Sequence, residues 1–429
     1  MRNIAIKPNV MQNAAGSCLV SFGNTKVLCT ASVETGVPPF LKGSGQGWLT
    51  AEYAMLPGST LSRKRRDDAK RDSRGVEISR LIGRSLRQAV DLFKLGENTI
   101  TIDCDVIQAD GGTRTASVTG GFVALCLAVD KMMEEKLISQ SPIVRQVAAV
   151  SCGIVEKNYR LDLDYSLDSN AETDMNVVAD ENGNIIELQA TGEQNPFSKE
   201  ALNTLVDMAL RGIRHIQFVQ QLVLMQYLKN FSIPCQIVLA SQNKNKAKEV
   251  AAILGKGFSI KTLAEVGFTS DIEENGTTFS ENAAIKSETA LKYTGLPCIA
   301  DDSGLSVKAL NGAPGIYSAR YSGIHGDDEK NNEKLLLEMQ NIKDREAKFV
   351  CALALSIPEA KTQVFIGELY GSIAEKASGK YGFGYDPLLI VENGKTLAEI
   401  SPEKKNAISH RAKALEKLKA YLYDMACGK

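Results

Sequence analysis

The segment Asp110-Gly-Gly-Thr-Arg-Thr115 has residues that suit anion binding. It follows an alternating strand pattern and leads into an apolar helical pattern from Val118 to Met133. Gly111 and Gly112 let the backbone approach an anion, and Arg114 can bind two of its oxygens. A tight turn with an exposed arginine is the alternative. The combination of loop, helix start and arginine favours the anion site.

A second polar loop lies near the middle of the chain. Ile237–Ala240 has the length of a buried strand, and Ser241-Gln-Asn-Lys-Asn-Lys246 separates it from a helical pattern. Free N–H groups and the positive end of the helix dipole suit phosphate at such a helix start. Lys244 and Lys246 would add charge. The loop is not a Walker loop, so spacing alone slightly favours an ordinary strand-to-helix turn with solvated lysines.

Carboxylates gather in both halves of the chain. The segment 162–174 includes Asp168 and Asp174 and could hold Mg²⁺, supply a general acid, or be a solvated loop. In the second half, Glu273-Glu274 and Asp301-Asp302 offer oxygen ligands for Mg²⁺. An adjacent Asp pair is more often a solvated turn. These carboxylates therefore indicate a binding site only in combination with neighbouring segments.

Those neighbours are an aromatic loop and a basic segment. Phe383-Gly-Tyr-Asp386 offers aromatic faces and a carboxylate to a base, while Lys404, Lys405, His410 and Arg411 add positive charge around the last predicted helix. His410 alone would more often be a helix cap. Together with the acidic pair, the two segments indicate a nucleoside triphosphate site.

A basic run lies in the first half. Arg63 to Arg74, which includes Arg66, holds seven basic residues against three acidic ones. Such runs are usually solvated loops. The functional alternative is a patch that binds the phosphate backbone of RNA.

The whole chain has the composition of a globular protein. Its 429 residues are enough for two or three domains, and apolar residues make up 44%. Net charge is −1, so a nucleic-acid site must be a local patch. The nine cysteines include no Cys-x-x-Cys pair, which fits a reducing cytosol. We find no secretion signal and no apolar run long enough for a bilayer, so we expect a cytoplasmic protein without membrane contact.

Periodicity places these residues on regular elements. The first half predicts hairpins around Gly23-Asn24 and Asn182-Gly183, helices over 77–93 and 118–133, and a long helix from Glu200. The second half alternates helix and strand patterns. We predict two domains of α/β and α+β class, over 1–231 and 236–429, joined by a short linker at 232–235. The first has a β-α-β fold, and the second has a mixed sheet.

The first half resembles ribonuclease PH, the bacterial phosphorolytic exoribonuclease that trims tRNA 3′ ends. The motifs are Gly23-Asn-Thr-Lys-Val-Leu-Cys-Thr-Ala-Ser, Gly45-Gln-Gly-Trp-Leu-Thr-Ala-Glu-Tyr, Asp103 to Thr115 and Asp168 to Val178. The chain starts about a dozen residues into the family pattern, and Gly58 stands where the family usually has arginine. Both departures are expected to weaken RNA binding or ring assembly.

This resemblance implies roles for individual residues. It implies that Arg74, Gly112, Thr113 and Arg114 bind inorganic phosphate and that Arg63 and Arg66 lie along the RNA path. It also implies that Asp168 and Asp174 are catalytic with help from Mg²⁺, and that six subunits form a ring.

The second half resembles the inosine/xanthosine triphosphate pyrophosphatases. The motifs are Ser241-x-Asn243-x-x-Lys246, Phe279-x-Glu-Asn-Ala283, Ala300 to Leu305, Gly312 to Tyr321, Gly382 to Pro387 and Ile408 to Arg411. The resemblance implies Mg²⁺-dependent hydrolysis of ITP, dITP and XTP to a monophosphate and pyrophosphate, with dimer contacts through this domain. Asp302 would activate water and, with Glu273, organise the metal. The nucleotide would be held by Ser241, Gln242, Asn243, Lys244, Asn245, Lys246, Ser303, Phe383, Gly384, Tyr385, Asp386, Lys405, His410 and Arg411.

We therefore expect a bifunctional enzyme that acts on tRNA 3′ ends with phosphate and on non-canonical purine nucleoside triphosphates. In the alternative, the first half is a non-catalytic RNA-binding or ring-scaffold module and only the pyrophosphatase is active. A further alternative is a second half that acts on canonical or other modified nucleotides. Arg74, Arg114, Asp168 and Asp174 are all present, which favours two active domains.

Overall fold

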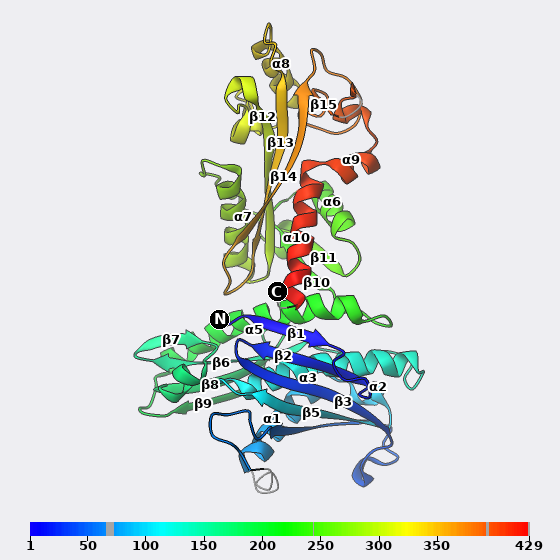
Figure 1. The fold of residues 1–429 in the computed structure, drawn as a ribbon, viewed down its shortest axis with the longest axis vertical. Helices are drawn as coiled ribbons and strands as arrows, with labels where there is room; N and C mark the ends of the chain where they lie inside the picture. Colours follow the sequence, from blue (N-terminus) through cyan, green and yellow to red (C-terminus); the bar gives the residue numbers. More distant parts are fainter. Residues whose placement is uncertain (66–72, 243, 392–393, 428–429) are drawn as a thin grey trace. The chain divides into compact units, whose positions relative to one another are not determined.

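The computed structural model describes residues 1–429 except 66–72, 243, 392–393 and 428–429 (Figure 1). Contacts divide the chain into two compact units, one formed by residues 1–235 with 422–429 and the other by residues 236–421. We call them the first and the second unit. The predicted linker, 232–235, ends at the first residue of strand β10 (Cys235–Leu239).

The first unit begins with a five-stranded sheet in the order β1-β2-β3-β5-β4. The strands are β1 (Ile4–Pro8), β2 (Gly16–Phe22), β3 (Thr25–Thr35), β4 (Trp48–Met55) and β5 (Asn98–Gln108). The predicted hairpin is confirmed, because β2 pairs antiparallel with β3 around Gly23, whose φ is +56°. β4 runs parallel to β5.

A second sheet of the first unit has the order β7-β6-β8-β9. Its strands are β6 (Val147–Val155), β7 (Asn158–Leu161), β8 (Thr173–Asp180) and β9 (Ile185–Gly192). β8 and β9 form the hairpin predicted around Asn182-Gly183. Short helix α4 (Tyr165–Ser169) links β7 to β8.

Helix α3 (Thr113–Glu134) is the core of the first unit. It contacts β2 and β3 of one sheet and β6 of the other, and its side chains from Thr115 to Asp130 are buried. By length and composition α3 could cross a bilayer, but 89% of its apolar window is buried inside this protein, as expected of a core helix. Its neighbours include α1 (Ser73–Arg87) and the 29-residue α5 (Lys199–Tyr227), and α2 (Leu92–Leu95) follows α1.

The second unit is built on a six-stranded sheet in the order β11-β10-β12-β13-β14-β15. Beside β10 its strands are β11 (Phe258–Thr262), β12 (Cys298–Val307), β13 (Glu346–Ser356), β14 (Gln363–Ile373) and β15 (Leu389–Ile390). β10 and β12 are parallel, whereas β12, β13, β14 and β15 pair antiparallel in turn. The sheet is mixed, so the predicted fold class is confirmed.

Helices surround this mixed sheet (Figure 1). They are α6 (Lys244–Leu254), α7 (Phe279–Thr294), α8 (Asp328–Glu338), α9 (Pro402–Ile408) and α10 (His410–Cys427). α7 packs on β12 and β13. α10 approaches β14 closely, since a side chain on Gly367 would come within 2.0 Å of the His410 carbonyl oxygen.

One expectation about the second unit is wrong. The sequence pattern predicts a short strand over Cys298–Ala300 that leads into Asp301 and Asp302, with Asp302 at the mouth of the sheet. The strand instead continues to Val307, and Asp301 and Asp302 pair in register with Leu353 and Ala352 of β13. Because successive strand residues point to opposite faces, the two carboxylates serve opposite sides of the sheet.

Candidate functional sites

The loop before α3 has the conformation that an anion site needs. Gly111 and Gly112 have φ of +72° and +64°, which favours glycine at both positions. A side chain on Gly111 would come within 2.5 Å of the Leu163 carbonyl oxygen, so backbone packs directly on backbone. Gly112 is the N-cap of α3, whose first N–H groups lack intrahelical partners. Thr113 follows, and its Oγ1 lies 2.8 Å from the Tyr53 hydroxyl.

Arg114 is held in place at this helix start by two side chains from other elements. Its Nη1 donates to Gln189 Oε1 of β9 at 2.7 Å and to Glu77 Oε1 of α1 at 3.4 Å. Gln189 also donates to Glu77 at 3.1 Å. Arg74, in the first turn of α1, is exposed. The guanidinium of Arg114 is therefore oriented before any ligand arrives.

Asp168 of α4 and Asp174 of β8 form a carboxyl pair near these arginines. Burial, and then the neighbouring charge of Asp168, raise the pKa of Asp174 to about 6, against the opposing effect of Arg114. Burial also raises the pKa of Asp168, although Arg74 and Arg114 oppose it. Asp174 Oδ1 is buried and has no hydrogen-bond partner within the described residues. The pair is suited to hold a proton or a divalent cation between the two carboxylates.

Arg63 belongs to a separate feature, which we call the basic cleft. This cleft of about 1280 Å³ runs along β4 and α1. Its cationic lining residues are Arg63, Lys64, Arg65, Arg80 and Arg87. Arg66 lies outside the described residues.

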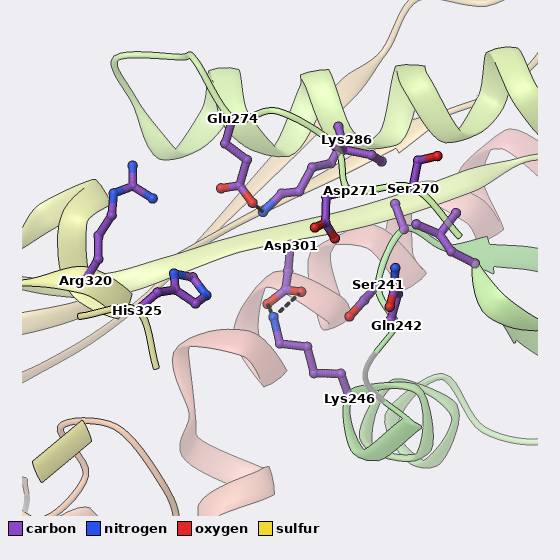
Figure 2. A pocket seen from close by; sticks show the side chains of 13 residues that line it. Ser241, Gln242, Lys246, Ser270, Asp271, Glu274, Lys286, Asp301, Arg320 and His325 are labelled. Carbon is purple, nitrogen blue, oxygen red and sulfur yellow. Dashed lines mark hydrogen bonds and ion pairs between the residues drawn. The ribbon is translucent and has the colours of Figure 1, made fainter. Parts of the chain in front are cut away.

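The second unit has a pocket of about 650 Å³ (Figure 2). Ser241, Gln242 and Lys246 line it from the segment that leads into α6 and from α6 itself. Asp301 lines it from β12, and Lys286 from α7. Asn243 is outside the described residues, and the side chains of Lys244 and Asn245 are outside the described part of α6.

Asp301 is the most heavily neutralised carboxylate of the pocket. Its oxygens accept from Lys246 Nζ at 3.1 and 3.2 Å and from Arg411 Nη2 at 3.0 Å. Ser303 Oγ donates to it at 3.3 Å. Burial opposes ionisation, but Lys246 and then Arg411 hold the pKa of Asp301 well below its usual range. A carboxylate with so low a pKa is a poor base.

Asp302 points to the α7 side of β12. Asn282 Nδ2 donates to its Oδ2 at 3.3 Å, and Lys286 Nζ lies 3.1 Å from its Oδ1. Burial raises the pKa of Asp302 despite the charge of Lys286. Lys286 Nζ also lies 3.2 Å from Glu274 Oε1, so Asp302 is connected to the pocket through Lys286.

The acidic loop before α7 contains two adjacent glutamates, both exposed. Glu274 lines the pocket, and its side chain points toward Lys286 (Figure 2). Glu273 and Asp302, which the resemblance implies as metal ligands, are not among the lining residues of this pocket.

The predicted base-binding residues form a cluster of their own. Lys405 Nζ lies 2.5 Å from Asp386 Oδ2 and 4.7 Å from the centre of the Phe383 ring, which is 60% exposed. Tyr385 is buried and donates to the Ser318 carbonyl oxygen at 2.9 Å. The Gly384 N–H donates to Asp328 at 2.7 Å. Phe383 and Lys405 thus present an aromatic face and a cation, but none of these residues lines the pocket of Figure 2.

His410 and Arg411 are buried rather than open to a ligand. The His410 ring stacks on Phe349 with centroids 4.9 Å apart, and its Nδ1 has no partner within the described residues. Burial, followed by the charges of Arg411 and Lys405, lowers the pKa of His410 to about 3. Arg411 spans from Asp301 to Glu249, whose Oε2 lies 2.7 Å from its Nη1.

The pKa of His410 predicts acid sensitivity. In the unfolded chain a histidine becomes protonated near pH 6.5, whereas in the folded protein the pKa of His410 is lowered to about 3. The neutral form therefore contributes stability above pH 6.5, which is lost progressively as pH falls toward 3. Between pH 7 and 5 the loss is about 2 kcal/mol. Urea unfolding at pH 7 and pH 5 should show this loss of stability in the natural protein, and the His410→Gln variant should lack it. Equal pH dependence in the two proteins would contradict the assignment.

Several residues at these sites escaped the sequence analysis. In the first unit they are Tyr53, Glu77 and Gln189. In the pocket they are Asp271, Lys286, Arg320 and His325. Lys286 alone had a usable signal, because it lies four residues after Asn282 on a predicted helix, and both contact Asp302.

Comparisons with known proteins agree with the division of the chain. Residues 1–129 and 145–212 match the models of domains 1 and 2 of the 3′ exoribonuclease family, and residues 237–421 match the model of the Ham1 family. Ribonuclease PH from Corynebacterium glutamicum (strain R) is 54% identical over 226 residues, which cover 52% of this chain and 92% of that protein.

Two solved structures match the second half. The Ham1 protein of Staphylococcus aureus is 46% identical, with a TM-score of 0.42, over 44% of this chain and 97% of that one. The nucleoside-triphosphatase, a dITP/XTP pyrophosphatase, of Mycobacterium abscessus is 44% identical, with a TM-score of 0.39, over 43% of this chain and 98% of that one.

Proposed function

The chain belongs to the ribonuclease PH family through its first half and to the Ham1 family through its second, and on this premise we propose that it is a bifunctional enzyme. The first unit shortens tRNA precursors from the 3′ end with inorganic phosphate. The second hydrolyses ITP, dITP and XTP. The two reactions share a problem, since a nucleophile must approach a phosphorus atom that is surrounded by negative oxygens.

Phosphorolysis is supported by the way the first unit combines cations with a carboxyl pair. A phosphate oxygen attacks the phosphorus of the last phosphodiester, the bond to the 3′ oxygen breaks, and a nucleoside diphosphate leaves. Arg74, Arg114 and the start of α3 would neutralise the attacking phosphate and hold it in line. The pair Asp168 and Asp174 would supply the proton that the leaving 3′ oxygen takes up.

We expect nucleotide removal from RNA to depend on inorganic phosphate. Purified protein would receive a tRNA precursor with and without phosphate, and the released nucleotides would be separated by chromatography. The expected products are nucleoside diphosphates, formed only with phosphate. Equal activity in phosphate-free buffer with release of monophosphates would show ordinary hydrolysis. No nucleotide release at all would favour the non-catalytic RNA-binding or scaffold module.

Pyrophosphatase activity is supported by the pocket around Lys246, Asp301 and Lys286. Lys246 and the start of α6 would bind phosphates, and Asp302, with its raised pKa, would take the proton from the attacking water. Attack at the α-phosphorus breaks its bond to the bridging oxygen and releases pyrophosphate. Phe383 and Lys405 would hold the base. Purified protein with ITP and Mg²⁺ should yield IMP and pyrophosphate in equal amounts, whereas release of inorganic phosphate would indicate a different cleavage.

The donor atoms at both sites fit Mg²⁺. In the first unit Asp174 Oδ1 is buried without a partner among the described residues, beside Asp168. In the second, Glu274 and Asp302 converge on one ammonium group. No group of three possible ligand residues occurs in the described parts of the chain, so phosphate oxygens and water would complete a shell, as is usual for Mg²⁺. Bound there, the ion would neutralise charge that develops on phosphate.

We further propose a cytoplasmic homo-oligomer, with a ring of six built by the first unit and dimer contacts made by the second. The eight described cysteines are free and buried, which suits a reducing compartment. The basic cleft with Arg63 would bind the RNA chain. Light scattering after size-exclusion chromatography would give the mass, and a monomer would contradict the ring.

A further inference from the structure

Arg2 contacts Asp162 and the loop Asp110–Gly112 before α3, which we call the phosphate loop. Its Nη2 and Nε lie 2.6 and 3.1 Å from the two carboxylate oxygens of Asp162, and its backbone N–H donates to Asp162 at 2.8 Å. Its Nη1 donates to the Asp110 carbonyl oxygen at 2.6 Å. The side chain of Arg2 is 15% exposed and that of Asp162 is 1% exposed. The ion pair is therefore well shielded from water. The guanidinium of Arg2 binds the Asp162 carboxylate in bidentate fashion through Nε and Nη2, while Nη1 remains for the Asp110 carbonyl oxygen.

These contacts join two loops that carry the proposed phosphorolysis residues. Asp110 precedes Gly111 and Gly112, and Thr25 Oγ1 reinforces the same loop by donating to the Gly111 carbonyl oxygen at 2.6 Å. Asp162 lies six residues before Asp168 and has φ of +61°, a left-handed conformation that needs support from its surroundings. The Tyr165 N–H donates a hydrogen bond to Asp110 Oδ1 at 3.3 Å, which is a further link between the two loops.

We propose that Arg2 is a positioning residue for phosphorolysis, which couples the phosphate loop before α3 to the segment that carries Asp168. The proposal rests on the proposed phosphorolytic activity. The two loops touch through backbone at Gly111, so a shift of one displaces the other. Phosphate and the carboxyl group must be aligned within a fraction of an ångström for in-line attack, and a misplacement of about 1 Å can cost 10²-fold in rate.

The geometry requires arginine rather than any cation. A lysine has one ammonium group and can bond Asp162 or the Asp110 carbonyl oxygen, but it lacks the fork that spans both. Loss of Arg2 would therefore disturb the alignment of the phosphate loop with the segment that carries Asp168.

The test compares phosphate kinetics of Arg2→Met, Arg2→Lys and the natural protein on a tRNA precursor, after each variant is shown to be folded by circular dichroism. For both variants we expect kcat/KM for phosphate to fall ~10- to 100-fold. The KM for phosphate should rise. A purely structural salt bridge would lower the melting temperature and leave these quantities unchanged. Added guanidinium ion should partly restore a folded Arg2→Ala variant.

A matched control is Arg84→Met. Arg84 also pairs with a carboxylate in the first unit, since its Nη2 lies 2.8 Å from Glu187 Oε1, but it is half exposed and contacts neither loop. We expect its phosphate KM to stay within about twofold of the natural value, because exposed ion pairs contribute little. If the natural protein shows no phosphate dependence, the proposed function fails. If it does, and Arg2→Lys or Arg2→Met keeps a natural phosphate KM, the coupling role is refuted. If Arg2→Met does not fold, Arg2→Lys decides.

Discussion

Asp302→Asn is expected to lower the turnover of ITP by ~10²- to 10⁴-fold, the range for a positioned acid–base group. Asparagine has nearly the same shape, and its amide oxygen can still accept a hydrogen bond from Lys286 or from Asn282, so the fold should survive. It cannot take a proton from water, and it binds Mg²⁺ more weakly. Phosphorolysis of tRNA ends by the same preparation should be unchanged, which serves as an internal control for concentration and folding.

The neighbouring Asp301→Asn variant separates proton transfer from stability. Asp301 pairs with Lys246 and with the buried Arg411, and removal of its charge leaves those cations uncompensated. Loss of one partner from a buried ion pair typically costs about 3–5 kcal/mol of stability. We therefore expect Asp301→Asn to unfold at lower urea concentration than Asp302→Asn, because Lys286, the partner of Asp302, keeps Glu274 as a second counter-charge. Near-natural ITP hydrolysis by Asp302→Asn would show that the assigned base is wrong and direct attention to Glu274.

Arg114→Ala is expected to lower the turnover of phosphorolysis by ~10²- to 10³-fold. This is the typical effect of removing one hydrogen-bond donor that stabilises the charge of the transition state. The arginine is already oriented by Gln189 and Glu77, so it is ready to bind phosphate. Its side chain is 19% exposed and Glu77 remains near solvent at 47%, so the variant should fold. The measurement is nucleoside diphosphate release from a tRNA precursor at saturating phosphate.

Hydrolysis of ITP should stay at its natural rate in Arg114→Ala, because the second unit has its own pocket. Arg145→Ala is a suitable control, since Arg145 is an exposed arginine of the same unit. Within the described residues its one hydrogen bond is donated to the Gln88 carbonyl oxygen at 2.9 Å. This variant should leave both activities intact. Parallel loss of the two activities in folded Arg114→Ala would contradict the independence of the sites.

Local patterns predicted the elements that hold these residues. The glycine pair before α3, the hairpin at Gly23 and the polar loop before α6 depend on turn chemistry and short periodicity, which a single sequence displays. Arg114, Asp168 and Asp174 lie near one another, as the family resemblance implies, although short helix α4, which carries Asp168, was not predicted. Their catalytic and binding roles stay predictions.

Long-range pairing accounts for what the sequence could not show. Arg2 and Asp162 are 160 residues apart, and nothing near either one indicates the other. The end of β12 was also misjudged, because two aspartates in a row are typical of a loop. A strand tolerates them when Lys246 and Arg411 neutralise one face and Lys286 the other. His410 stacks on Phe349, and Tyr385 donates to the Ser318 carbonyl oxygen, and these partners are more than 60 residues away in the sequence, where no local pattern indicates them.

The buried free cysteines provide natural reporters of local opening. A thiol inside the core reacts with a labelling reagent only when its surroundings open, so its rate of modification measures the free energy of that opening. Cys298 and Cys351 would report on the second unit, and Cys18, Cys29, Cys104, Cys126 and Cys152 on the first. Mass spectrometry of peptides after timed labelling would thus give a separate stability for each unit within the intact chain.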